Sequence, residues 1–150
     1  MNAFDILKED HQKVSDLFEK LEPTTERAVK TREELFTKLK TELDIHAFIE
    51  ETLLYPVLKE IEETRDITLE GIEEHRLVKQ LLAELEQMPK GTEQWTAKMT
   101  VLKENVEHHV EEEEGEMFKQ ARSALTKEQI EQLTTRVQAE KKKQMAASQR

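Results

Sequence analysis

Four of the five histidines in the sequence lie among regularly spaced apolar residues: His11, His46, His75 and His109. Two of them are followed four residues later by a glutamate, Glu50 after His46 and Glu113 after His109. Side chains four residues apart on a helix share a face and are close enough to bind the same ion. Imidazole and carboxylate groups together suit iron, manganese or zinc. The pattern therefore predicts a metal site built from these six side chains.

Polar side chains on the inward faces of helices are costly to bury unless each finds a partner. A single buried histidine is usually just hydrogen-bonded, and a polar network that only fixes the helices is the alternative for the whole set. Four histidines, one for each expected helix and at repeated spacings, favour metal binding over that alternative. Six protein ligands are too many for one tetrahedral zinc ion but suit two ions that share carboxylates. A pair of ions is therefore expected.

The apolar period also separates inward-facing residues from their polar neighbours. In the fourth expected helix, steps of three and four residues from Trp95 through Val106 reach His109 and Glu113 and pass over His108. The other acidic residues around Glu113 are therefore expected mainly on the solvated face. Some residues flank the expected site and are candidates for contacts with its ligands: Glu51, Tyr55, Lys79, His108 and Glu114.

Composition limits the classes of fold and site. The 150 residues suit one domain, and only three glycines and three prolines leave little material for tight turns. Charged residues make up 37% of the chain, which is typical of long solvated helices. There is no cysteine, so thiolate metal sites and iron–sulfur clusters are excluded.

Charge and hydropathy limit the partners. The formal net charge of −10 argues against nucleic acid, because a phosphate backbone requires a basic surface, and the basic run at 141–143 is too short to change this. No apolar run approaches the length of a membrane span, and charged residues stand near the first residue, where a signal peptide needs an apolar stretch. We therefore expect a soluble, cytoplasmic protein with no membrane partner.

The apolar spacing predicts four long helices and a fifth with a narrower stripe. The expected helices are one at about 4–21, one at about 26–64, a third between a break at 65–66 and a loop at 88–91, a fourth after that loop, and a fifth that begins at 126. Pro56 predicts a kink near Leu53, and Lys119, at the corresponding place in the fourth helix, predicts less kinking there. Residues 146–150 are expected to fray.

The sequence also repeats itself at a nearly constant offset. A shift of 64 residues places His11 on His75, and a shift of 63 places both His46 on His109 and Glu50 on Glu113. Two copies of a helical hairpin predict an all-α, up-down-up-down four-helix bundle with an internal two-fold repeat over residues 1–123. Residues 126–150 are expected to form a separate C-terminal helix and tail.

The order of these motifs resembles the hemerythrin-like family, and specifically its HHE cation-binding domain. The resemblance covers about residues 3–120 and rests on one histidine, a His-x-x-x-Glu pair, a second lone histidine and a second such pair. It implies a helical bundle that binds two iron ions through the six residues named above. It further implies an oxo or hydroxo bridge between the ions and an open position for a small ligand.

The sequence departs from the oxygen-carrying hemerythrins at two places. Those proteins have a further histidine one turn after the third-helix histidine, where this chain has Lys79, and a carboxylate five residues after the fourth-helix histidine. Here Glu113 follows His109 at four residues. The chain therefore resembles the branch with four histidines and two glutamates, and the departures argue against reversible oxygen carriage.

The leading hypothesis is a non-haem di-iron protein that senses or reacts with oxygen, peroxide or nitric oxide. The alternative is an iron-binding, storage or sensing module without redox turnover, and a metal-free scaffold is the third. The sequence names no catalytic residue. Tyr55 and His108 are the nearest candidates for a proton donor. The sequence also leaves open whether the protein is an enzyme. It also leaves any protein partner unspecified.

Overall fold

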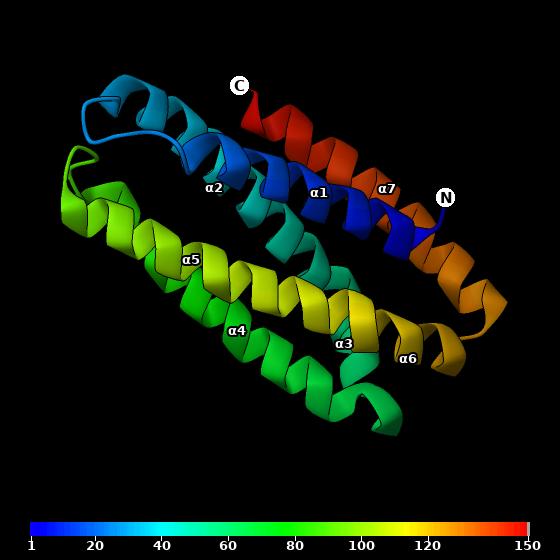
Figure 1. Cartoon of the computed structure of the whole chain (residues 1–150). Coiled ribbons are helices and arrows are strands. Elements are labelled where there is room, and N and C mark those ends of the chain that lie inside the picture. Colours follow the sequence, from blue (N-terminus) through cyan, green and yellow to red (C-terminus); the bar gives the residue numbers. More distant parts are fainter. Residues whose placement is uncertain (150) are drawn as a thin grey trace.

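Helices make up nearly all of residues 1–149, which this computed structural model describes (Figure 1). No strand occurs within these residues, so the prediction of an all-helical fold is confirmed. In chain order the elements are α1 (Ala3–Leu21), α2 (Val29–Ile49), the π-helical turn η1 (Glu50–Leu54), α3 (Tyr55–Lys59), α4 (Glu62–Gln87), α5 (Glu93–Glu112), the π-helical turn η2 (Glu113–Met117), α6 (Phe118–Ala124) and α7 (Lys127–Ser148).

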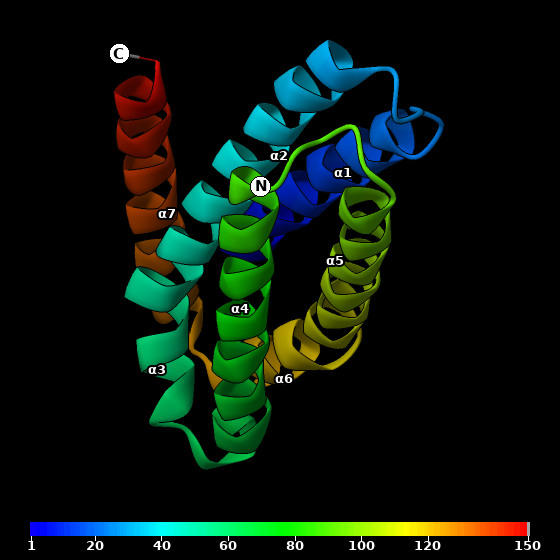
Figure 2. The same cartoon turned by 90° about the vertical axis from the view of Figure 1, so that its left-hand side faces the viewer.

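The helices are arranged as two hairpins with one further helix alongside. Helix α1 packs against α2, and α4 packs against α5, with the chain reversing direction between the members of each pair (Figure 1). Figure 2 shows α7 beside α2, on the side away from α5. None of the helices in residues 1–149 is both long and apolar enough to cross a membrane.

Apolar faces of these helices form two core clusters, and the polar residues lie where the clusters meet. Along α1, His11 falls between Leu7 of one cluster and Val14 of the other. Along α2, His46 falls between Leu43 and Ile49 in the same way. Close packing on both sides leaves these histidines little conformational freedom. The bundle therefore holds one buried polar layer between two apolar ones.

The starts of α1 and α7 have reciprocal side-chain caps. The Asn2 side chain accepts a hydrogen bond from the Asp5 amide at 3.1 Å, and the Asp5 carboxylate accepts one from the Asn2 amide at 3.0 Å. Thr126 and Gln129 form the same reciprocal pair at the start of α7. These capping boxes satisfy backbone donors that the first helical turn leaves free.

The predicted break at 65–66 is wrong, because the chain turns earlier. Helix α3 ends at Lys59, Ile61 is extended, and α4 already begins at Glu62. The Thr64 hydroxyl donates to the Leu58 carbonyl at 2.6 Å, so a side chain satisfies an acceptor that the ended helix leaves free. The second helix likewise begins at Val29 rather than near residue 26.

The π-helical turns η1 and η2 stand at corresponding places in the two repeats. The first lies where Pro56 predicts a kink, but the second forms with Lys119 at the matching position. The expectation of a more regular fourth helix is therefore wrong in this respect. Each turn begins at an inward-facing glutamate, Glu50 or Glu113, so the glutamate is the feature that the two turns share.

Helix α7 docks on the bundle. Its Leu133 and Val137 are buried in the same core cluster as residues near the start of α1, and the Ala3 amide donates to the Thr134 hydroxyl at 2.9 Å. The helix extends to Ser148, and the fraying expected for residues 146–150 stays a prediction. Arg150 lies outside the described residues.

Candidate metal centre

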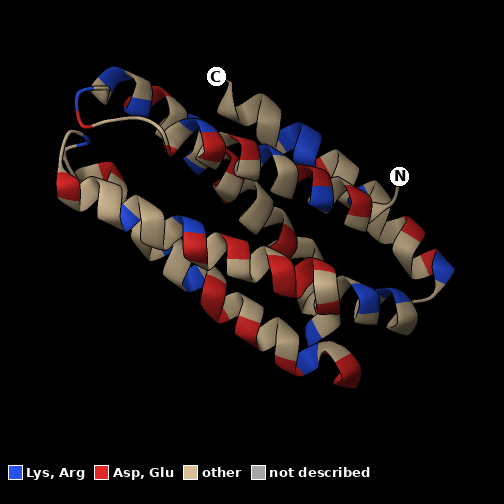
Figure 3. Ribbon diagram, in the orientation of Figure 1, with Lys and Arg blue, Asp and Glu red and all other residues tan. Residues whose placement is uncertain are grey.

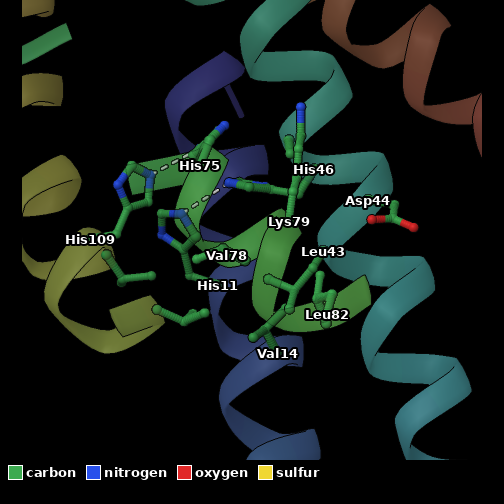
Figure 4. Close-up of a pocket in the computed structure, with 13 residues that line it drawn as sticks. His11, Val14, Leu43, Asp44, His46, His75, Val78, Lys79, Leu82 and His109 are labelled. Atoms are coloured by element: carbon green, nitrogen blue, oxygen red, sulfur yellow. Dashed lines mark hydrogen bonds between the residues drawn. The ribbon is translucent and has the colours of Figure 1, made fainter. Parts of the chain in front are cut away.

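The six residues singled out by the sequence converge in the buried layer between the core clusters. Figure 4 shows the four histidines pointing toward one another, one from each of the helices α1, α2, α4 and α5. The side chains of Glu50 and Glu113 are fully buried beside them. Two groups of four potential ligands result, and both contain the two glutamates: His11, His46, Glu50 and Glu113 in one, His75, His109, Glu50 and Glu113 in the other.

The histidines are grouped in two pairs. The Nε2 atoms of His11 and His46 lie 3.2 Å apart, and those of His75 and His109 lie 3.1 Å apart. In each pair the two histidines come from the two helices of one hairpin, α1 and α2 in the first pair and α4 and α5 in the second. Such distances suit two ligand atoms of a single ion. The first pair is called the α1–α2 pair below, and the second the α4–α5 pair.

The two glutamates connect the pairs. The Oε1 atom of Glu50 lies 3.1 Å from Nε2 of His46 and 3.1 Å from Nε2 of His75. The carboxylate of Glu113 lies 3.1 Å from Nε2 of His11 through one oxygen and 3.1 Å from Nε2 of His109 through the other. Each carboxylate therefore touches one histidine of each pair, as two shared ligands between two ions would.

Four further carboxylates orient the histidine rings from outside. The Nδ1 atom of His11 donates to Glu114 at 2.6 Å, and that of His75 donates to Glu51 at 2.8 Å. A donating Nδ1 fixes the ring so that the Nε2 lone pair of the neutral imidazole faces the centre. The structure thus gives the predicted flanking residues Glu51 and Glu114 an orienting position.

The sequence reasoning missed the other two orienting carboxylates. Nδ1 of His46 donates to Asp10 at 3.0 Å, and Nδ1 of His109 donates to Glu74 at 2.7 Å. Asp10 directly precedes His11, Glu74 directly precedes His75, and the two carboxylates match under the 64-residue shift. The repeat therefore contained the signal that could have found them.

Tyr55 distinguishes the two halves of the centre. Its hydroxyl contacts both glutamates and lies 3.1 Å from Nε2 of His75 and 3.3 Å from Nε2 of His109. The 63-residue shift places Phe118 at the matching position, and its ring stacks on that of His11. The α4–α5 pair therefore has a hydroxyl beside it where the α1–α2 pair has only an aromatic ring.

The remaining predicted residues lie outside this arrangement. Lys79 forms an ion pair with Glu51 at 2.6 Å, and so contacts a carboxylate that orients His75. His108 is 64% exposed and touches Glu112 at 3.0 Å and Glu74 at 3.6 Å. The structure therefore places His108 on the surface, where it approaches the centre only by way of Glu74, which in turn contacts His109.

Without metal, the electrostatics of the layer favour charged histidine–glutamate pairs. Burial alone would lower the pKa of His109, but Glu113 and Glu74 raise it to about 12. Burial likewise opposes the charge of His46, yet Glu50 and Asp10 hold its pKa well above the usual value. Burial and the neighbouring Glu113 would raise the pKa of Glu50, but His46 and His109 lower it to about 2. Protons therefore compete with metal for these atoms.

These shifts predict how the stability of the metal-free protein depends on pH. Raised histidine pKa values contribute stability that is complete below about pH 6.5 and is lost as pH rises toward the folded values. The lowered Glu50 pKa contributes stability above about pH 4.5 that is lost as pH falls toward 2.

The melting temperature of the metal-free protein should therefore be highest between about pH 4.5 and 6.5. Above that range the free energy of unfolding should fall by up to about 1.4 kcal/mol per pH unit for each histidine with a raised pKa, and the melting temperature should fall with it. Differential scanning calorimetry after chelation tests this. A melting temperature that does not fall between pH 6.5 and 9 would contradict it.

The chemistry of the donor set fits metal ions. When every Nδ1 is occupied by a carboxylate, neutral histidines direct two lone pairs at each other across about 3 Å, which only a proton or a cation relieves. The Oε2 atom of fully buried Glu50 has no hydrogen-bond partner among residues 1–149. A buried unpaired carboxylate oxygen is costly. A bound cation would satisfy both the facing Nε2 lone pairs and the unpaired oxygen of Glu50.

The sequence is similar to those of several known proteins. The chain is 31% identical over 143 residues to a DNA nickase of Nostoc sp., covering 95% of this chain but only 40% of that protein. It is 34% identical over 121 residues to the uncharacterized protein Rv2633c of Mycobacterium tuberculosis, covering 79% of this chain and 71% of that protein.

A solved structure and a family model agree with this likeness. The crystal structure of a hemerythrin HHE cation-binding domain-containing protein, the Rv2633c homolog from Mycobacterium kansasii, matches with a TM-score of 0.84 and 28% identity. The match covers 98% of this chain and 89% of that chain. The family model of the hemerythrin HHE cation-binding domain matches residues 2–121, which include all six converging residues. The chain belongs to the hemerythrin HHE cation-binding domain family.

Proposed function

We propose that the protein binds two iron ions and uses them to sense or to react with a small oxidant: oxygen, peroxide or nitric oxide. The observation that supports this most strongly is the pair of four-residue ligand groups that share Glu50 and Glu113. In this proposal the α1–α2 pair holds one ion, the α4–α5 pair holds the other, and the two glutamates are shared. Iron, when bound, supplies reversible one-electron chemistry and an open coordination position.

A cavity beside the four histidines supports a small ligand. It has a volume of about 40 Å³, room for roughly three molecules the size of water. Its walls are largely aliphatic, with Val14, Leu43 and Val78 among them, while Asp44 and Lys79 also contribute to its lining (Figure 4). Walls of this kind suit a small ligand such as a diatomic molecule or a peroxide.

The chain's own residues hold protons around this cavity. Burial, together with Glu113 and Glu50, keeps the pKa of Tyr55 well above its usual value, so the hydroxyl stays protonated. The four Nδ1 protons stay on the outer faces of the histidines, where carboxylates accept them. The inner atoms of the site are therefore available to a cation, and Tyr55 is a proton-bearing group in contact with both glutamates.

Iron storage or iron sensing without redox turnover is the second candidate. The unpartnered Oε2 atom of Glu50 and the facing histidine nitrogens favour it, because they make the folded layer itself responsive to whether metal is present. Nucleic acid has no part in either proposal, since a net charge of −10 gives a phosphate backbone little to bind. The nickase activity in the name of the Nostoc protein belongs to a chain of which this sequence spans 40%.

Iron loading followed by an oxidant tests the proposal. Metal-free protein given iron(II) in air should take up two irons per chain and gain the near-ultraviolet charge-transfer absorption of ferric iron. Reduced, iron-loaded protein should then consume oxygen, peroxide or nitric oxide with a change in this spectrum. His109→Ala should lose iron and the reaction, whereas the adjacent and exposed His108→Ala should keep both.

Two outcomes would change the conclusion. Uptake of two irons with no reaction toward any of the three oxidants would favour the storage or sensing candidate. Equal iron content in the His109→Ala and His108→Ala variants would contradict the assignment of the ligands.

A further inference from the structure

Helix α7 breaks the repeat of the bundle. The 63-residue shift places Ile45 on His108 and Ile49 on Glu112, and the 64-residue shift places Asp10 on Glu74. In the first repeat Ile49 belongs to the core cluster that also contains Leu133 and Val137 of α7, and the partly buried Ile45 packs against that cluster. In the second repeat the corresponding face carries polar residues. The two orienting carboxylates, Asp10 and Glu74, therefore lie in different surroundings.

Asp10 is held on the covered side. It is 2% exposed, and it accepts from Nδ1 of His46 at 3.0 Å and from Nζ of Lys141 at 2.6 Å. Lys141 belongs to α7, and its side chain is 17% exposed. Figure 3 shows the basic segment of α7 above α1. The Asp10 carboxylate is therefore bonded at both oxygens, one to His46 and the other to Lys141.

Glu74 is open on the other side. It accepts from Nδ1 of His109 at 2.7 Å, but its side chain is 23% exposed. Its second oxygen faces His108 at 3.6 Å, and Glu112 lies on the same surface. Figure 3 shows acidic residues gathered where α5 passes into α6. Water and solutes reach this carboxylate, whereas α7 keeps them from Asp10.

The other two orienting carboxylates differ less between the halves. Glu114 beside His11 is 36% exposed, and Glu51 beside His75 is 30% exposed. The contact of Glu51 with Lys79 joins two partly exposed side chains, and such ion pairs contribute little. The contrast between Asp10 and Glu74 is therefore the main difference in how the two halves are held from outside.

From this contrast we propose that Lys141 of α7 is a positioning residue that locks His46 through Asp10 and makes the two ions inequivalent. The ion at the α1–α2 pair exchanges slowly, because His46 cannot turn away without breaking two buried contacts. The ion at the α4–α5 pair exchanges first, because Glu74 can release His109 to solvent. This inference rests on the proposed function, since it presumes that two ions occupy the centre.

Release of iron to a chelator tests the inference on the full chain. Protein loaded with iron(II) under anaerobic conditions is mixed with excess 2,2′-bipyridine, and the coloured complex is followed by stopped flow. The unmodified protein should release its iron in two phases of equal amplitude. Lys141→Gln should accelerate the slow phase roughly tenfold or more and leave the fast phase unchanged, in line with the usual effect of outer-shell partners on metal binding.

Two further variants serve as controls. Lys143→Ala removes the same charge from an exposed position of the same helix, and it should leave both phases unchanged. Lys141→Arg keeps the charge and a donor, and it should restore most of the slow phase. The metal-free melting temperature of Lys141→Gln should fall below the Lys143→Ala value, because the change removes one partner of a largely buried ion pair, and Lys141→Arg should restore it.

Several results would overturn the inference. Release of both ions in one phase from the unmodified protein would show that they are equivalent. A Lys141→Gln profile equal to that of Lys143→Ala would remove the role of Lys141. Equal acceleration of both phases would assign α7 a general structural role. Binding of two irons with any of these profiles leaves the proposed function standing, whereas failure to take up iron contradicts both.

Discussion

Replacing Glu113 by alanine is expected to abolish the binding of both ions. Glu113 is fully buried and its two oxygens lie 3.1 Å from His11 of one pair and 3.1 Å from His109 of the other. Loss of an outer-shell partner typically costs 10- to 100-fold in metal affinity. Loss of a ligand shared by both ions should exceed that range, so elemental analysis should find close to zero irons per chain.

The control for this variant is Glu111→Ala, two residues away on the exposed face of α5. It removes the same charge and should retain two irons per chain. The metal-free Glu113→Ala protein should remain folded. Without the buried carboxylate, the neighbouring His109 is no longer held in its charged form and can be buried as a neutral side chain. Retention of two irons by Glu113→Ala would contradict the shared-ligand arrangement.

Removing the metal from the unmodified protein is expected to lower its melting temperature by roughly 10 °C or more. A ligand that binds only the folded state stabilises it by about 4 kcal/mol when present at a thousand times its dissociation constant. For a domain of this size each kcal/mol shifts the midpoint by about 2–4 °C. The metal-free layer also leaves Oε2 of Glu50 without a partner among the described residues.

Calorimetry before and after chelation measures this effect at one pH. Glu113→Ala provides the comparison, since its melting temperature should not respond to the chelator. An unmodified protein that melts at the same temperature with and without metal would show that binding and stability are not coupled. The layer would then have to be treated as a polar network that is stable on its own.

The sequence was informative about the six central residues for a physical reason. A polar residue on an apolar stripe stands out, and His109 and Glu113 were separable from His108 and its acidic neighbours because the helical period leaves only one inward choice. The internal repeat then joined residues that are far apart along the chain. The all-helical fold followed from the same period together with the scarcity of glycine and proline.

Other features left a weaker mark in the sequence, or none. Asp10 and Glu74 are two of 33 acidic residues, and what sets them apart is a partner on another helix. The break before Glu62 depends on the Thr64 side chain, which bonds back to the Leu58 carbonyl. The stripe of α7 predicted a helix but not its docking place, because contacts such as that between Lys141 and Asp10 span 131 residues.

The location of bound iron tests the central claim most directly. Crystals of the iron-loaded protein, measured on both sides of the iron absorption edge, should give two anomalous peaks per chain. One peak should lie between the α1–α2 pair and the two glutamates, and the other between the α4–α5 pair and the same glutamates. No peak in the buried layer, or a single one, would contradict a centre that holds two ions.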